Sequence, residues 1–197
     1  MEQEKARQAF LQDAILCHTD VLCFPEFAGA DRISASEIDC CITNFVPPTI
    51  LTKQKRLLPV RAEYREALLD FCRTHQIALV EWRDNWSFIL DEFLDTELPL
   101  QVQECDYRML EQVGISRLQC DQIRMGIMSF MLPYNALLWE WCYLGFTDLI
   151  WAAQGILPGT KAAYTGEGLE RFYRWAVEIA CMQPKNIEKI PPLGTGK

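Results

Sequence analysis

The sequence predicts an all-α protein, a single-domain bundle of about six to eight helices. Apolar residues recur at three- and four-residue spacings through most of the chain, as on one face of a helix. Only residues 77–82 are a plausible strand, and a single strand cannot form a sheet. We therefore place one helical domain at residues 1–183 and expect residues 184–197, with their consecutive prolines, to form a flexible tail.

The composition narrows the class of protein before any motif is considered. The chain has 197 residues, with 27 acidic and 19 basic side chains and a net charge of −8. This balance argues against a nucleic-acid partner, which would require a basic face. Nine cysteines without a C-x-x-C pair, and a charged start without an apolar signal core, indicate reduced thiols in a cytoplasmic protein. We expect no metal and no cofactor.

The first two helices are expected before residue 47. Apolar spacing predicts a helix over residues 3–22, ended by Pro25. Ser34 followed by Glu37 is a capping-box pattern, and it predicts a second helix that continues to Phe45 and stops at Pro47.

A long loop is predicted at residues 46–60, and it is basic in an otherwise acidic chain. It contains Lys53, Lys55 and Arg56. These residues form a candidate interaction loop for an acidic partner or a phosphate, or they belong to an ordinary solvated loop.

The middle of the chain is expected to continue as helices. Residues 60–76 have a helical pattern, and the spacing from Leu79 to Leu94 favours helix over strand for residues 77–82. A further helix over 104–113 breaks at Gly114 and restarts after Ser116 as N-cap. This corner has the rhythm of a helix-turn-helix motif, but the acidic chain disfavours DNA binding.

The segment from Gly126 to Leu157 is the most distinctive part of the sequence. It has no Lys or Arg, and its only acids are Glu140 and Asp148. A membrane span would place both acids near the bilayer centre, at a cost of roughly 2.5–3.5 kcal/mol each. We therefore expect no membrane span, and instead a buried central helix, or a helix pair broken at Gly145.

Three tryptophans lie in this segment and make it the candidate ligand site. On one helix, Glu140 would lie among them, with a raised pKa that is typical of a functional carboxyl. Alternatively Glu140 bonds another helix, and Asp148 lies in a first helical turn. The candidate ligand-binding residues are Trp139, Glu140, Trp141, Asp148 and Trp151.

A last helix is predicted over residues 166–182, with Thr165 as its cap. The sequence contains no catalytic motif, and the catalytic residues of any enzyme activity are unknown. The first expectation is a non-enzymatic regulatory protein of the cytoplasm that binds a protein partner. The alternative is a helical-bundle ligand-binding protein or enzyme with a tryptophan-lined pocket for a small apolar ligand. The oligomeric state stays open.

Overall fold

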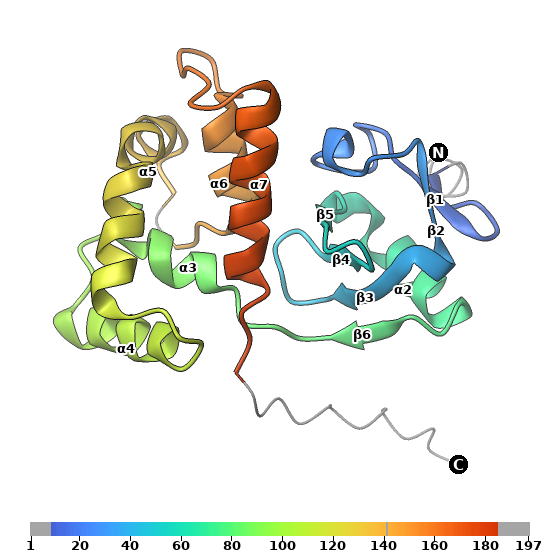
Figure 1. The fold of residues 1–197 in the computed structure, drawn as a ribbon, viewed down its shortest axis with the longest axis horizontal. Coiled ribbons are helices and arrows are strands. Elements are labelled where there is room, and N and C mark those ends of the chain that lie inside the picture. The colour runs from blue at the N-terminus through green and yellow to red at the C-terminus, as the bar shows by residue number, and fades with distance from the viewer. Residues whose placement is uncertain (1–8, 141, 185–197) are drawn as a thin grey trace.

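The computed structural model describes residues 9–140 and 142–184, and it has a mixed α/β fold. The prediction of an all-α bundle is wrong. The described part of the chain contains two sheets with six strands as well as six α-helices. The strands lie in the N-terminal half and most of the helices follow them (Figure 1).

The smaller sheet pairs β1 (Ala14–Leu16) with β2 (Arg32–Ser34) in antiparallel register. In the larger sheet, β6 runs parallel to β3 and the other neighbours are antiparallel. The strands across the larger sheet are, in order, β5 (Leu57–Pro59), β4 (Thr49–Thr52), β3 (Ile38–Ile42) and β6 (Ala78–Val80).

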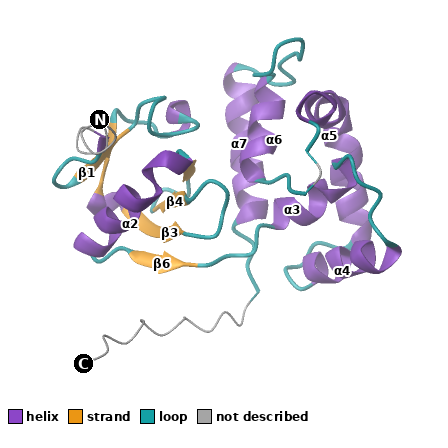
Figure 2. Cartoon of the chain, turned by 180° about the vertical axis from the view of Figure 1, so that it is seen from behind, coloured by secondary structure: helices purple, strands orange, loops and turns teal. Residues whose placement is uncertain are grey.

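One helix covers the larger sheet, and the other helices form a second layer beside it. Helix α2 packs on the sheet, and α7 lies between the sheet and the other helices (Figures 1 and 2). Short 3-10 turns precede β3 and α2 and follow α3. The helices are α2 (Arg65–Thr74), α3 (Asn85–Leu90), α4 (Leu100–Glu111), α5 (Arg117–Leu138), α6 (Phe146–Gln154) and α7 (Gly166–Ala180).

Strand β3 was mistaken for part of a helix because its residues 40–42 are buried on both faces of the sheet. Cys40, Cys41 and Ile42 of β3 are all buried, so the strand shows an unbroken apolar run without the alternation of a half-exposed strand. Glu37 does bond Ser34 as a capping box predicts, but the box closes one 3-10 turn before β3.

Three further expectations fail for related reasons. The described part of residues 3–22 contains β1 where a helix was expected. The predicted loop 46–60 is the β4–β5 hairpin, and residues 78–80 form a strand. A lone strand at 78–80 argued against a sheet because the other three strands of the larger sheet were not recognised from the sequence.

The C-terminal helices were predicted more accurately. Ser116 caps α5, as its hydroxyl accepts a hydrogen bond from the Gln119 amide at 3.3 Å. The central segment does divide into α5 and α6, but α5 ends at Leu138, and Gly145 is the N-cap residue of α6 after a loop. Thr165 is the N-cap residue of α7. The segment is not buried throughout, however. Helix α6 is largely buried, whereas one face of α5 is exposed, with Leu132 50% accessible.

Helix α7 joins the two halves of the molecule into one hydrophobic core. The Tyr173 hydroxyl donates to the Leu57 carbonyl at 2.7 Å, and its ring stacks on Phe27 at 3.9 Å. On the other side, Trp86 Nε1 of α3 donates to the Ala176 carbonyl at 2.9 Å. The domain predicted at residues 1–183 is thus not an all-helical one, and its bounds remain a prediction. The predicted tail lies outside the described residues, apart from Pro184.

Within the described part of the chain, no helix combines the length and apolarity needed to cross a bilayer.

Candidate functional site

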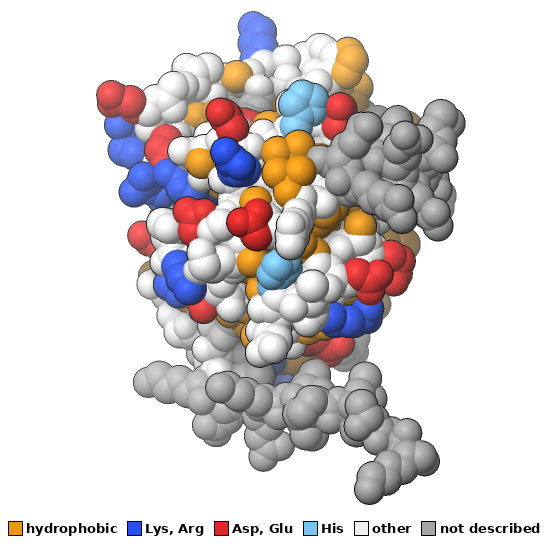
Figure 3. All heavy atoms as spheres, turned by 90° about the vertical axis from the view of Figure 1, so that its right-hand side faces the viewer, with side chains coloured by type: hydrophobic (Ala, Val, Ile, Leu, Met, Phe, Trp, Pro, Cys, Tyr) orange, Lys and Arg blue, Asp and Glu red, His pale blue; other side chains and the backbone are white. Residues whose placement is uncertain are grey.

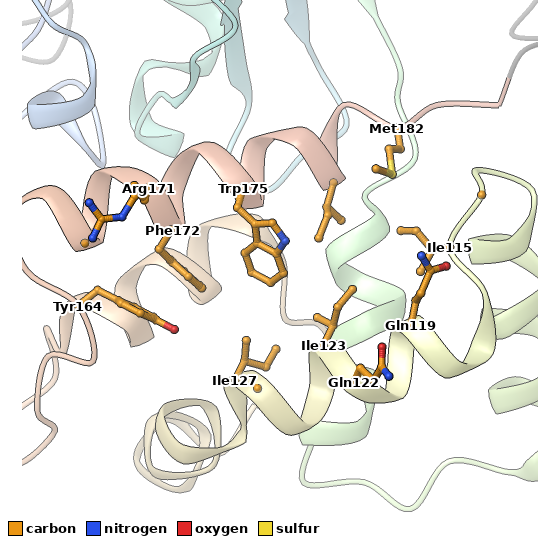
Figure 4. Close-up of a pocket in the computed structure, with 14 residues that line it drawn as sticks. Ile115, Gln119, Gln122, Ile123, Ile127, Tyr164, Arg171, Phe172, Trp175 and Met182 are labelled. Carbon is orange, nitrogen blue, oxygen red and sulfur yellow. The ribbon is translucent and has the colours of Figure 1, made fainter.

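The main candidate site is a cleft of about 710 Å³ between α5 and α7. We call it the α5–α7 cleft. Its walls combine aliphatic and aromatic side chains with the polar Gln119 and Gln122. Figure 4 shows Phe172 and Trp175 pointing from α7 toward Ile123 and Ile127 of α5. Arg171 is the one charged side chain among the described lining residues.

Helix α3 holds the two walls of the cleft at a fixed separation. From α5, the buried Arg124 donates to the carbonyls of Phe88 and Ile89 at 3.0 and 2.9 Å. From α3, Asn85 Nδ2 donates to the carbonyls of Ile179 and Met182 at 2.8 and 2.6 Å. These charge-assisted and buried bonds make α3 a brace that links α5 to the C-terminal end of α7.

The aromatic side chains of the cleft also pack on one another. Phe172 stacks on Tyr164 at a ring distance of 4.6 Å and meets Trp175 at 5.4 Å. Trp175 in turn packs edge-on against the fully buried Trp86 at 5.4 Å. Phe172 is buried, whereas Tyr164 and Trp175 are half-buried, so these two rings are already positioned for contact with a ligand.

Two helical glycines widen the cleft. Gly126 lies inside α5, and Gly168 lies in the first turn of α7. A Cβ atom built on either residue would meet no other atom within 4 Å. Neither glycine has a positive φ, so neither backbone conformation requires it. The packing and the backbone of the chain therefore leave both glycines unexplained.

The structure does not gather the predicted ligand-binding residues into this cleft. Trp139 ends α5 and is 66% exposed, while Glu140 follows in the loop and accepts a hydrogen bond from the Cys142 amide at 2.9 Å. Glu140 was expected to share a helix with Trp151, but it lies between α5 and α6. Trp151 packs against Phe24 at a ring distance of 6.0 Å. Trp141 lies outside the described residues.

Asp148 occupies the first turn of α6, one of the two positions considered for it. Its carboxylate accepts from the Gly145 amide at 2.9 Å and from the Tyr134 hydroxyl at 3.0 Å. Burial raises the pKa of Asp148, although both hydrogen bonds act in the opposite direction. Its ligand-binding role, like that of the other four residues, remains a prediction.

The predicted interaction loop is the turn of the β4–β5 hairpin. Lys55 lies 3.4 Å from Asp39, and Arg56 lies 3.3 Å from Glu170 of α7. Arg56 also donates to the Phe27 carbonyl at 2.6 Å. Lys53 is exposed. Acids of the same chain thus face two of these three cations, and an acidic partner at this turn remains a prediction.

A buried group of charges lies on the far side of α5 from the cleft. Asp106 is 5% exposed, and its Oδ2 atom has no hydrogen-bond partner. Burial and the Asp106 carboxylate raise the pKa of Asp91 to about 7. Arg124 lines the same small cavity, and its positive charge lowers the pKa values of Asp91 and Asp106 in part. The cluster joins the segment after α3 to α4 and α5.

The histidines and acids do not form a metal centre in the described part of the chain, where no three His, Cys, Asp or Glu side chains are placed to hold an ion. Figure 3 shows the surface of the N-terminal half, where acidic and basic side chains alternate and the two histidines lie apart. His75 packs on Phe71 at a ring distance of 4.5 Å.

Comparison with protein-family models, with curated proteins and with solved structures finds no match to this chain.

Sequence reasoning missed the cleft because its walls come from helices that are separated in the chain. The sequence alone gives no sign that Phe172 and Trp175 of α7 lie opposite Ile123 and Ile127 of α5. One available signal was Gly126, a glycine inside a helix, where it is disfavoured by about 1 kcal/mol relative to alanine.

Proposed function

We propose that this is a non-enzymatic binding protein whose α5–α7 cleft takes an apolar helical segment of a polypeptide. The observation that carries the proposal is the cleft itself, with the aromatic side chains along α7 and the two glycines that leave it open. Apolar grooves of this kind bind amphipathic helices through residues spaced by three, four and seven positions.

The glycines support a close approach of another backbone. A glycine inside a helix costs about 1 kcal/mol relative to alanine, and no contact within residues 9–140 and 142–184 requires Gly126 to lack a side chain. A small residue at a helix surface lets a second helix come nearer than a larger residue would. The free energy lost at Gly126 is then recovered only when the cleft is filled.

The dimensions of the cleft suit a helix of about four turns. Its lining runs along α7 from Gly168 to Met182, which at 1.5 Å per residue is about 21 Å. Arg171 stands on this wall and would favour a segment with an acidic residue nearby.

The chemistry of the lining supports binding over catalysis. None of the described lining residues is a His, Cys, Ser, Asp or Glu, the side chains that most often act as nucleophiles or general bases. An aromatic and aliphatic surface of this kind supplies desolvation and shape, which are the sources of affinity in helix recognition.

The test is a selection of displayed peptides of about four helical turns against the wild-type protein. Selected peptides are then measured by fluorescence anisotropy on the wild type and on Gly126→Leu and Gly168→Leu, which place a side chain in the cleft. Thr74→Leu, at an exposed position on α2, adds a similar side chain elsewhere and is the control.

We expect peptides with apolar residues at i, i+3 and i+7 that lose at least about tenfold in affinity on both glycine variants and none on the control, a loss of about 1.4 kcal/mol. Peptides that bind both glycine variants as tightly as the wild type would refute the cleft as the binding site. So would a selection that yields no helical motif.

A small apolar ligand is the second candidate function, because about 710 Å³ lies within the usual range of ligand pockets, roughly 300–1,000 Å³. Such a ligand would quench Trp175, and the quenching would be lost in Trp175→Phe. A panel of apolar compounds that quenches the wild type, combined with a failed peptide selection, would favour this alternative.

A further inference from the structure

Strand β6 leaves one edge of the larger sheet open. In the described part of the chain it pairs only with β3, and Figure 1 shows no described helix or strand beyond it. Its three residues are uncharged, and Leu79 is 41% exposed. The opposite edge is closed, because the Cys23 amide donates to the Pro59 carbonyl of β5 at 2.9 Å. An open and uncharged edge is a site for pairing with another strand.

The hydrogen bonds of β6 show which main-chain groups face the open edge. The Val80 carbonyl accepts a hydrogen bond from the chain that follows β3, at 2.9 Å, so Val80 faces β3. Trp82 faces the same way, because its amide and its carbonyl bond the Asn44 side chain at 3.0 and 2.8 Å. The main-chain groups of successive residues in a strand point to opposite sides. The N–H and C=O groups of Leu79 and Glu81 therefore point to the open edge.

The end of the described chain reaches this edge beside Glu81. The Arg83 amide donates to Gln183 Oε1, and Gln183 Nε2 donates to the Arg83 carbonyl, both at 2.9 Å. The Gln183 side chain thus bonds the two main-chain groups that a neighbouring strand would bond. Pro184 follows as the last described residue. The chain therefore leaves the described structure next to the open groups of Glu81 and Leu79.

We propose that residues 185–190 form an additional antiparallel strand on β6 and close the open edge of the larger sheet. These residues include no proline, so each has an N–H group to donate. Pro191 and Pro192 have none, and they end the strand. The tail expected from residue 184 then begins at Pro191. This strand belongs to the N-terminal half of the molecule and is independent of the α5–α7 cleft.

The sequence of residues 185–190 fits the edge in one register. Antiparallel pairing that continues from the contact at Arg83 places Lys185 opposite Glu81. Two residues further on, Ile187 lies opposite the exposed Leu79. An opposite-charge pair and an apolar pair are cross-strand contacts that stabilise a sheet. Because Glu81 and Leu79 face outward, each exchanges two main-chain hydrogen bonds with its partner in this register. A shift by one residue in either direction loses both pairs.

A segment of the same chain is favoured over a second copy as the partner of β6. It begins two residues after Gln183, so it is held beside the edge at an effective concentration of about millimolar. Its two lysines and one glutamate give it a net charge of +1 beside Glu81. Two whole copies, each with a net charge of −8, repel each other instead.

The experiment is amide hydrogen exchange, followed by NMR, on the full chain and on two shortened chains. One shortened chain ends at Pro184 and lacks the proposed strand, and the other ends at Ile190 and keeps it. The Leu79 and Glu81 amides are the reporters of the open edge. The Val80 amide faces β3 and is the internal control. Circular dichroism confirms that each chain is folded.

Ile187→Pro in the full chain is an independent variant that keeps the chain length. It removes the N–H group that donates to the Leu79 carbonyl in the proposed register. Leu193→Pro places a proline beyond the proposed strand and is its matched control. Should the chain that ends at Pro184 fail to fold, these two variants decide the question.

We expect the reporter amides to exchange at least about tenfold more slowly in the proteins that keep the strand than in those that lack or interrupt it. The Val80 amide should exchange equally slowly in all of them. Equal exchange of the reporters in every protein would refute the additional strand, as would an Ile187→Pro variant with wild-type protection. Protection that rises with protein concentration in the chain ending at Pro184 would also refute it, because a second copy would then close the edge.

Discussion

The sharpest single prediction concerns Gly126→Ala. The residue lies inside α5, its φ is not positive, and a Cβ atom there would meet open space. The substitution therefore adds helix propensity and no clash, and it should raise the free energy of unfolding by about 0.8–1.0 kcal/mol. In a chain of this size, that corresponds to a rise in the thermal midpoint of about 2–4 °C.

The assay is urea unfolding followed by circular dichroism, with thermal unfolding as a second readout. Gly155→Ala is the control. Gly155 has φ of 64°, and its Cβ would lie 2.4 Å from the Ala162 amide nitrogen, so the same substitution there must destabilise the protein. If Gly126→Ala left stability unchanged or lowered it, Gly126 would have a role within the fold, and the argument that it keeps the cleft open would fail.

Two further predictions concern buried carboxyl groups. Gly145→Ala should lower the free energy of unfolding by about 1–3 kcal/mol. The new Cβ atom would lie 2.4 Å from the Tyr143 hydroxyl and displace this hydroxyl from the buried Asp84, to which it donates at 2.6 Å. A variant as stable in urea as the wild type would contradict this. The pKa of Asp91 is raised to about 7 from about 3.9 in the unfolded chain, so its proton stabilises the fold below about pH 4, and this contribution is lost as the pH rises through 7. Asp91→Asn keeps the side chain neutral and able to donate to Asp106. In urea unfolding, this variant should be as stable as the wild type near pH 4 and more stable than the wild type near pH 8. A difference in stability that stays constant across this range would refute the assignment.

The sequence was most predictive where local chemistry decides the structure. Ser116, Gly145 and Thr165 mark helix ends through caps and breaks that act within a few residues. Such signals do not depend on distant parts of the chain. This is why the starts of α5 and α6 and both ends of α7 were placed close to where they are observed, whereas the end of α5 at Leu138 was not predicted.

The sheet could not be found in the same way, because its strands are defined by their partners. Residues 78–80 become a strand only through parallel pairing with β3, some 38 residues earlier in the chain. The burial of β3 and β4 on both faces removes the alternating pattern that would have identified them. A hairpin with Lys53, Lys55 and Arg56 in its turn then reads as a basic loop.

The candidate site shows a different limit of sequence reasoning. An uncharged apolar helix is required wherever water is excluded, whether by the core of the same chain or by a partner, and the residue types are the same in both cases. The Gly126–Leu157 segment contains both kinds, since Ile150 of α6 is fully buried and Leu132 of α5 is half exposed. Glycine separates the two cases, because a core helix gains from filling its space, whereas a helix that receives a partner must leave it open. Gly126 is the first residue of this segment and lies on the exposed side of α5, and its replacement by alanine tests which of the two α5 serves.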